Sequence, residues 1–114
     1  MLPKAARIRL TRDFERVFSA RRSLSGRFVR MAFVPAIGSQ SRLGIITSTK
    51  VSKKATVRNR LRRRVRSIMG PTLPLLRPPI DMVVMCQPAA ATAPFKDFES
   101  DVRACLHRIF PNIV

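Results

Sequence analysis

Arginine side chains grouped around one asparagine are the clearest candidates for ligand binding in this chain of 114 residues. Arg58-Asn59-Arg60 lies inside a basic segment, residues 50–66, which holds nine Lys or Arg residues and no acid. Guanidinium groups bind phosphate oxygens through paired hydrogen bonds, and Asn59 adds a neutral donor and acceptor beside them. About six to ten such contacts suffice for tight, salt-sensitive binding, so the segment predicts a nucleic acid as partner, and its spacing favours RNA.

The distribution of charge along the chain strengthens this prediction. All six acids lie outside residues 16–80, whereas that stretch carries sixteen of the 23 basic residues. A formal net charge of +17 repels itself in a compact fold unless phosphates or counterions screen it. An ordinary soluble surface would mix both signs. We therefore expect the native partner to contribute to the stability of the fold.

Residues for catalysis by the protein itself are scarce. The single histidine, His107, falls on the predicted outer side of the last helix, with no acid at a spacing that suggests a dyad. The six carboxylates are too scattered for a magnesium cluster, and the four glycines form neither a phosphate loop nor a dinucleotide turn. Cys86 and Cys105 lack metal-ligand spacing and fall at apolar phase, so we expect buried thiols rather than a disulfide or a zinc site.

Length and composition indicate one folded domain. A chain of 114 residues with 46% hydrophobic content can bury a modest core, unlike a disordered basic arm. We expect the domain to span residues 1–114, with residues 1–9 as a flexible N-terminal segment. No apolar run approaches the roughly twenty residues of a membrane span, and no apolar signal core follows residues 1–9. A cytoplasmic location without a membrane partner is therefore expected.

Hydrophobic periodicity predicts the elements that carry these residues. A first helix over residues 11–21, which Thr11 can cap, places Phe14 and Phe18 on one face. Alternation over residues 27–34 predicts a strand, and a second strand follows over residues 42–49 after a loop. We expect these two strands to pair antiparallel as neighbours.

The basic segment falls on the next predicted element. A helix over residues 53–69 has one apolar stripe, which leaves most of its arginines on a displayed opposite face. Residues 81–86 are continuously apolar after the first, as expected of a central strand, and a last helix starts after Pro94. The buried stripe of that helix is predicted to comprise Phe95, Phe98, Val102, Leu106 and Ile109. The order α-β-β-(β)-α-β-α, with one optional short strand, indicates an α+β sandwich of one sheet and packed helices.

Aromatic residues offer a second kind of RNA contact. Phe14 and Phe18, together with Phe28, are placed to stack on unpaired bases, which is how single-stranded RNA is commonly held. Core packing is the alternative for Phe14 and Phe18, because a short helix with both rings inward has the same pattern. The sequence leaves both alternatives open for these two rings.

The segment KKATVRNRLRR, residues 53–63, resembles the signature helix of the bacterial ribonuclease P protein family. Three further segments resemble that family in order and spacing. They are DF and VF within residues 13–18, SRLGI at residues 41–45 and DMVV at residues 81–84. The resemblance covers nearly the whole chain.

This resemblance implies a small partner of a large catalytic RNA, in which RNA-bound magnesium activates the water that cuts precursor tRNA at its mature 5′ end. The partners implied are the ribonuclease P RNA and precursor tRNA, and no protein partner is predicted. The protein itself would carry no catalytic residue, no metal ligand and no firmly bound cofactor, although the holoenzyme requires Mg. The family fold has a left-handed βαβ crossover and resembles a domain of a small-subunit ribosomal protein, an exception to the usual right-handed rule.

By similarity, two groups of residues would bind RNA. The first group lies on the helix over residues 53–69 and would contact the catalytic RNA. It comprises Lys53, Lys54, Arg58, Asn59, Arg60, Arg62, Arg63 and Arg66. The second group would hold the single-stranded 5′ leader in a cleft between the first helix and the sheet. It comprises Phe14, Phe18, Phe28, Arg30 and Lys50.

Two positions depart from the family pattern. The family commonly has a tyrosine or another aromatic on the cleft side of the first strand, where this chain has Ala32 and contains no Tyr at all. Weaker stacking of the leader is expected as a result. The family also commonly has paired lysines after the second strand, where this chain reads Thr49-Lys50, so one phosphate contact is expected to be missing.

Two other classes of protein would also fit the charge and the fold. A structural RNA-binding protein, such as a ribosomal protein or an RNA chaperone, would co-purify with ribosomal subunits. A DNA-compacting basic protein would show no preference between duplex DNA and structured RNA of equal length. A clear RNA preference would exclude the second of these.

Overall fold

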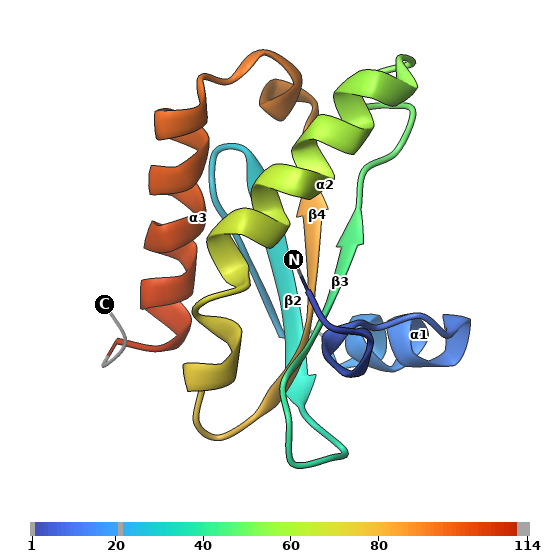
Figure 1. The fold of residues 1–114 in the computed structure, drawn as a ribbon, viewed down its shortest axis with the longest axis vertical. Coiled ribbons are helices and arrows are strands. Elements are labelled where there is room, and N and C mark those ends of the chain that lie inside the picture. Colours follow the sequence, from blue (N-terminus) through green and yellow to red (C-terminus); the bar gives the residue numbers. More distant parts are fainter. Residues whose placement is uncertain (1, 21, 112–114) are drawn as a thin grey trace.

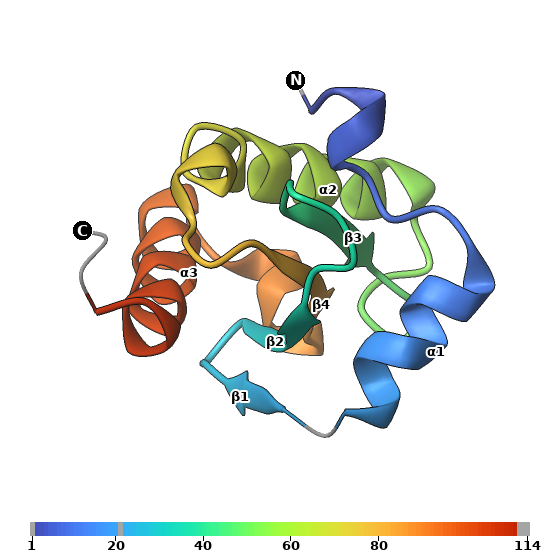
Figure 2. The ribbon, with the colours of Figure 1, turned by 90° about the horizontal axis from the view of Figure 1, so that it is seen from below.

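One mixed sheet separates the helices into two layers in the computed structural model, which describes residues 2–20 and 22–111 (Figure 1). Helices α2 and α3 cover one face of the sheet, and α1 lies on the other (Figure 2). The elements in chain order are η1 (Lys4–Ala6), α1 (Thr11–Ser19), β1 (Ser23–Ser25), β2 (Val29–Pro35), β3 (Arg42–Ile46), α2 (Ala55–Met69), η2 (Leu73–Leu75), β4 (Ile80–Cys86), η3 (Pro88–Thr92) and α3 (Phe95–Ile109). The predicted α+β class is confirmed, and the optional short strand is present as β1, although it precedes the two predicted strands instead of following them.

The strands are ordered β1-β2-β4-β3, so the prediction that the second strand pairs with the first is wrong. Strand β4 lies between them, antiparallel to β2 and parallel to β3. Its nearly continuous burial explains this place, because an apolar strand is stable only where both of its faces are covered. With α2 in front of the sheet in Figure 1, β3 and β4 both point upward and β4 lies to the left, which makes the β3-α2-β4 crossover left-handed.

Each face of the sheet has its own core. The larger core lies under α2 and α3 and includes Leu61, Met82 and Phe98, all fully buried. The smaller core lies under α1 and is built around Val17 and Val83. Since α1 is short and crosses the strands, it covers only part of its face of the sheet (Figure 2).

The N-terminal segment differs from its prediction. Residues 1–9 were expected to be flexible, but over the described residues 2–9 the side chains of Leu2, Ala6 and Ile8 are buried. The Ile8 N–H donates to the Leu43 carbonyl oxygen at 2.9 Å, and Arg7 forms a parallel β-bridge with Leu43. The segment therefore covers the outer edge of β3. Its apolar residues alternate with polar ones, so it can pair with this edge strand while its apolar side chains face the core.

The ends of several elements differ from prediction through local contacts. The proposed Thr11 cap is wrong, since Leu10 occupies the N-cap position and no side chain caps α1 there. Helix α2 begins later than predicted, at Ala55. Ser52 Oγ accepts the Lys54 N–H at 3.1 Å, which holds this stretch in a turn before the helix.

The predicted buried stripe of α3 is confirmed at Phe98, Val102 and Leu106, whereas Ile109 at its end is half-buried. Phe95 is 39% exposed, so its predicted burial is wrong. Its ring lies in the first turn of α3, where the guanidinium of Arg64 packs over it at 5.6 Å from the ring centroid. Cys105 belongs to the buried face of the helix and is a free thiol, as is the buried Cys86.

None of the helices within residues 2–20 and 22–111 has the length and apolar character required to cross a membrane.

Candidate nucleic-acid interface

The outward side of α2 carries a cationic surface, the α2 basic face, which comprises Arg58, Asn59, Arg62, Arg63 and Arg66. Two hydrogen bonds within the protein orient its side chains. Arg58 Nη1 donates to the Ser52 carbonyl oxygen at 2.8 Å, and Arg62 Nη1 donates to Asn59 Oδ1 at 2.7 Å. The arginines with a carboxylate partner in the described residues are Arg16, Arg42 and Arg103, none of which lies on α2. The charge of the α2 basic face is therefore available to a polyanion.

Two α2 arginines lie apart from this face. Arg60 Nη2 donates to the Ala91 carbonyl oxygen at 3.1 Å, and Arg64 Nη1 donates to the Ala93 carbonyl oxygen at 2.9 Å. Burial, and secondly the neighbouring charge of Arg60, lowers the pKa of Arg64. Both side chains thus attach α2 to η3 and the segment after it. Arg60, predicted to contact RNA, remains exposed but has one N–H engaged within the protein.

A second cationic surface lies on the opposite side of the sheet. A groove of about 260 Å³ separates α1 from β1, β2 and β4, and we call it the α1 groove. It is lined by Val17, Phe18, Arg22, Ser23, Arg30, Ala32 and Met85. Phe18 is 42% exposed, and Arg30 Nη2 donates to Ser23 Oγ at 3.2 Å. The structure therefore brings the predicted pair Phe18 and Arg30 together over the small side chain of Ala32.

Sequence reasoning missed four residues of the α1 groove: the buried Val17, and Arg22, Ser23 and Met85. Arg22 and Ser23 reach it because β1 pairs with β2, placing Ser23 beside Ala32 in the register. Met85 reaches it because β4 lies next to β2. Both placements depend on which strands pair, β1 with β2 and β4 with β2. The local sequence carries no signal for either pairing.

Phe14 lies in different surroundings from Phe18. Its half-buried ring packs over Gly44, where an added Cβ would come within 2.7 Å of the ring. It also lines a smaller hollow between α1 and α2 that includes Arg62 and Arg66. The structure therefore distinguishes the two rings that the sequence left open. Phe14 packs against the sheet, and Phe18 is exposed in the α1 groove.

Phe28 is wrong as a leader-binding residue. It is 5% exposed and stacks on Phe98 of α3 with the ring centroids 6.5 Å apart, on the far side of the sheet from α1. The cause is Asp101, whose Oδ2 accepts the Phe28 N–H at 2.7 Å and whose Oδ1 accepts the Arg27 N–H at 2.8 Å. This carboxylate holds the backbone before β2 in a turn, so the strand alternation begins only at Val29.

Lysines assigned to the two sites are exposed. Lys50 lies in the connection after β3 and does not line the α1 groove. Lys53 and Lys54 precede the first turn of α2. These three residues remain predictions, since no described contact places them in either surface.

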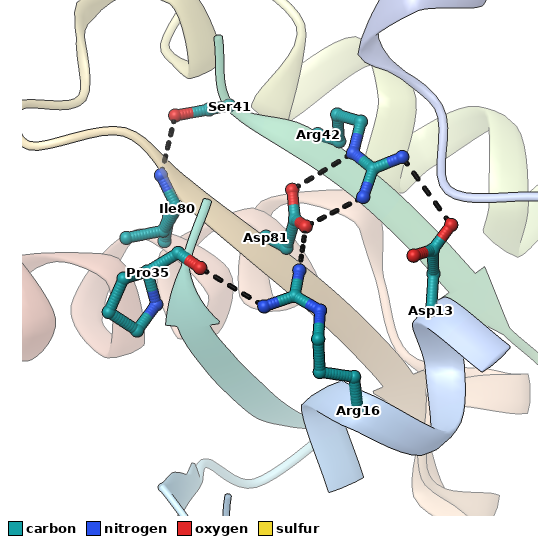
Figure 3. Close-up of polar contacts among 7 residues, drawn as sticks. All are labelled: Asp13, Arg16, Pro35, Ser41, Arg42, Ile80 and Asp81. Carbon is teal, nitrogen blue, oxygen red and sulfur yellow. Dashed lines mark hydrogen bonds and ion pairs between the residues drawn. The ribbon is translucent and has the colours of Figure 1, made fainter. Parts of the chain in front are cut away.

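A partly buried ion-pair network fixes α1 against the sheet (Figure 3). The fully buried Asp81 accepts two hydrogen bonds from Arg42, from Nε at 3.1 Å and Nη2 at 2.7 Å, and a third from Arg16 Nη2. Arg16 Nη1 also donates to the Pro35 carbonyl oxygen at 3.2 Å, and Arg42 Nη1 lies 3.5 Å from Asp13 Oδ2. Hydrogen bonding to Asp81 raises the pKa of Arg42. Because Arg16 and Asp13 belong to α1, this network orients the wall of the α1 groove that carries Phe18.

Groups able to do chemistry are sparse in the described residues. His107 is exposed on α3, as predicted. No cluster of three or more His, Cys, Asp or Glu side chains suited to a metal ion occurs in residues 2–20 and 22–111. Burial raises the pKa of the Cys86 thiol to about 12, which keeps it protonated and a poor nucleophile near neutral pH.

Comparison with known proteins identifies the family of this chain. A family model described as Ribonuclease P matches residues 2–110. The ribonuclease P protein component of Synechocystis sp. is 34% identical over 98 residues, covering 85% of this chain and 79% of that protein. The corresponding protein of Syntrophomonas wolfei is 32% identical over 108 residues, covering 95% and 90%. The solved RNase P protein from Thermotoga maritima superimposes with a TM-score of 0.78 at 30% identity, covering 90% of this chain and 96% of that one. This chain therefore belongs to the ribonuclease P protein family.

Proposed function

We propose that this protein holds two RNA segments at once, the catalytic RNA on the α2 basic face and the single-stranded 5′ leader of precursor tRNA in the α1 groove. As a protein component of ribonuclease P, it acts in the processing of the tRNA 5′ end. The observation that carries the proposal is that the two cationic surfaces lie on opposite faces of one sheet. A protein built in this way can bind one RNA without blocking the other.

The α1 groove suits a single strand rather than a duplex. It combines one exposed aromatic ring, Phe18, with two guanidinium groups, Arg22 and Arg30. Aromatic stacking together with contacts to the backbone phosphates is the usual way to hold unpaired nucleotides without strict sequence preference. Ala32 leaves the floor of the groove free of a second ring, so we expect one stacked base rather than two.

The α2 basic face suits a structured RNA. Its arginines have no described carboxylate partner, and a guanidinium matches the geometry of phosphate oxygens. Each contact made there would release counterions and make binding salt-dependent. We expect the face to contribute affinity and orientation for the catalytic RNA.

We propose that the chemical step belongs to the RNA subunit of a ribonucleoprotein. The Mg required by the holoenzyme would act as a Lewis acid that activates water, and we place it on the RNA because the described side chains offer no cluster of ligands. The protein's own contribution is to bind the catalytic RNA and to orient the leader. The endonucleolytic cut would thus depend on positioning by Phe18, Arg22 and Arg30.

Cleavage of a labelled precursor tRNA by the cognate ribonuclease P RNA at low magnesium tests this function. We expect a cut at the mature 5′ end that depends on the protein, and no cut by the protein alone. A protein that bound the RNA but never stimulated cleavage would overturn the proposal in favour of a structural RNA-binding role. A precursor with a very short leader serves as the matched control. It keeps the bond that is cut but cannot fill the α1 groove, so the protein should stimulate its cleavage little.

A further inference from the structure

The N-terminal segment adds one more cation to the α2 basic face. Arg7 lines two neighbouring hollows, and both are also lined by Arg66. The larger hollow, of about 550 Å³, adds Arg63 and Ser67, and the smaller one, of about 170 Å³, adds Arg62. No acidic residue lines either hollow. A residue far from α2 in sequence thus meets three of its arginines.

Arg7 is held in place by contacts that leave its terminal nitrogens available. Its Nε donates to the Leu2 carbonyl oxygen at 2.9 Å, and its backbone bridges to Leu43 at the edge of β3. Burial of Leu2 and Ile8 on either side anchors the segment further. In the part of the chain that the structure describes, Nη1 and Nη2 of Arg7 have no hydrogen-bond or carboxylate partner.

The chemistry of the two hollows points to phosphate. Four guanidinium groups without an acid among them repel one another, and a phosphodiester would relieve that repulsion while accepting paired hydrogen bonds. The side chain of Arg7 is pre-oriented by its Nε bond, so little conformational entropy would be lost on binding. A neutral small molecule would leave the charges uncompensated.

We infer that Arg7 completes a phosphate-binding site with Arg62, Arg63 and Arg66, and that the backbone of the catalytic RNA occupies it. The choice of the catalytic RNA rests on the proposed function, because the hollows are continuous with the α2 basic face. The N-terminal segment is then part of the RNA-binding surface and contributes a contact that the basic run on α2 cannot supply alone. Its folded path along β3 is what brings that contact to α2 (Figure 2).

The test measures the affinity of the full-length protein for the cognate catalytic RNA over a range of salt concentrations. Arg7→Ala should weaken binding by about tenfold at moderate salt, the effect of losing one charge-assisted hydrogen-bonded contact. The slope of log affinity against log salt should fall by about one. Arg9→Ala is the matched control: it removes the same charge from the same segment, but Arg9 is exposed and lines neither hollow.

The outcomes separate this inference from the proposed function. Binding by Arg7→Ala that equals that of Arg9→Ala would overturn the inference, and Arg62→Ala would then show whether the α2 basic face still contributes. If Arg62→Ala also bound normally, the proposed function would fail as well. A loss confined to the affinity of the assembled holoenzyme for precursor tRNA would overturn the catalytic RNA as the occupant.

A folding defect is distinguished by a second variant. Thermal unfolding without RNA is recorded for each protein, and Arg7→Lys is measured beside Arg7→Ala. The lysine retains the charge but loses the paired geometry, so it should preserve the salt slope and still bind several-fold more weakly than the natural protein. Full affinity in Arg7→Lys together with an unfolded Arg7→Ala would overturn the guanidinium role.

Discussion

The carboxylate of Asp101 accepts a 2.7 Å hydrogen bond from the backbone N–H of Phe28. The same group accepts the N–H of Arg27 at 2.8 Å and that of Val29 at 3.2 Å, so one side chain of α3 satisfies three consecutive donors. Gly26 permits this approach, since an added Cβ would lie 2.5 Å from Asp101 Oδ1. The contact attaches α3 to the start of β2 and turns Phe28 into the core.

Replacing Asp101 should therefore destabilise the protein. Asp101→Ala leaves the Phe28 and Val29 N–H groups without their acceptor, and we expect a loss of about 2 to 3 kcal/mol in the free energy of unfolding, measured with urea. Asp97→Ala, on the same helix and exposed, should cost less than about 0.5 kcal/mol. Equal effects of the two substitutions would remove Asp101 from this role.

The buried Asp81 should be a second acid on which stability depends. Asp81→Asn leaves Arg16 and Arg42 without their shared carboxylate. Removal of one partner from a fully buried ion pair costs about 3 to 5 kcal/mol, but both arginines are partly exposed to solvent, so we expect a loss of about 2 to 3 kcal/mol. The exposed pair of Glu99 and Arg103 is the control, and Glu99→Gln should change stability by less than about 0.5 kcal/mol. An Asp81→Asn loss below about 1 kcal/mol would contradict the network.

Phe18 should discriminate leader-bearing from mature tRNA. Phe18→Ala is expected to reduce the affinity of the holoenzyme for precursor tRNA by about 1 to 3 kcal/mol, the usual contribution of one stacked base, and to leave mature tRNA binding unchanged. Phe95→Ala removes another partly exposed ring outside the α1 groove and should have no such effect. An equal loss for both tRNAs would exclude a leader contact by Phe18.

Arginines of α2 should fall into two groups. Arg58→Ala and Arg62→Ala are each expected to weaken binding to the catalytic RNA by about 1 to 3 kcal/mol, if each makes a charge-assisted phosphate contact. Arg64→Ala should instead lower stability, because Arg64 donates to the Ala93 carbonyl oxygen. The measurements are RNA affinity at low and moderate salt and the free energy of unfolding. Unchanged affinity for Arg58→Ala and Arg62→Ala would take both residues out of the interface.

The buried Cys86 thiol should make the free energy of unfolding decrease at high pH. Burial raises its pKa from 9.0 to about 12, so the folded state keeps the proton that the unfolded state loses. Stability should be fully retained below about pH 9 and decline between about pH 9 and pH 12. Cys86→Ala should show a smaller decline over that window than the natural protein, in unfolding measured at fixed pH values. Identical pH profiles would mean that the buried thiol does not contribute.

The α2 helix and the place of β4 were predictable from sequence. Helical periodicity separates the apolar stripe of α2, which contains Leu61 and Val65, from Arg62 and Arg63 using only local spacing. The uninterrupted apolar run of β4 required cover on both faces and hence a central position. The motif over residues 53–63 indicated the family, which the comparisons confirm.

Other features were decided by the tertiary structure alone. Periodicity fixes how a side chain points relative to its own element, but not which element covers that side. Phe28 and Phe18 both fitted a stacking role, and only the Asp101 contact and the orientation of α1 distinguish the buried ring from the displayed one. Arg7 lies beside the α2 arginines only because the N-terminal segment pairs with β3. The local sequence therefore determined the charged helix, whereas long-range pairing, which no local pattern encodes, determined what lies beside it.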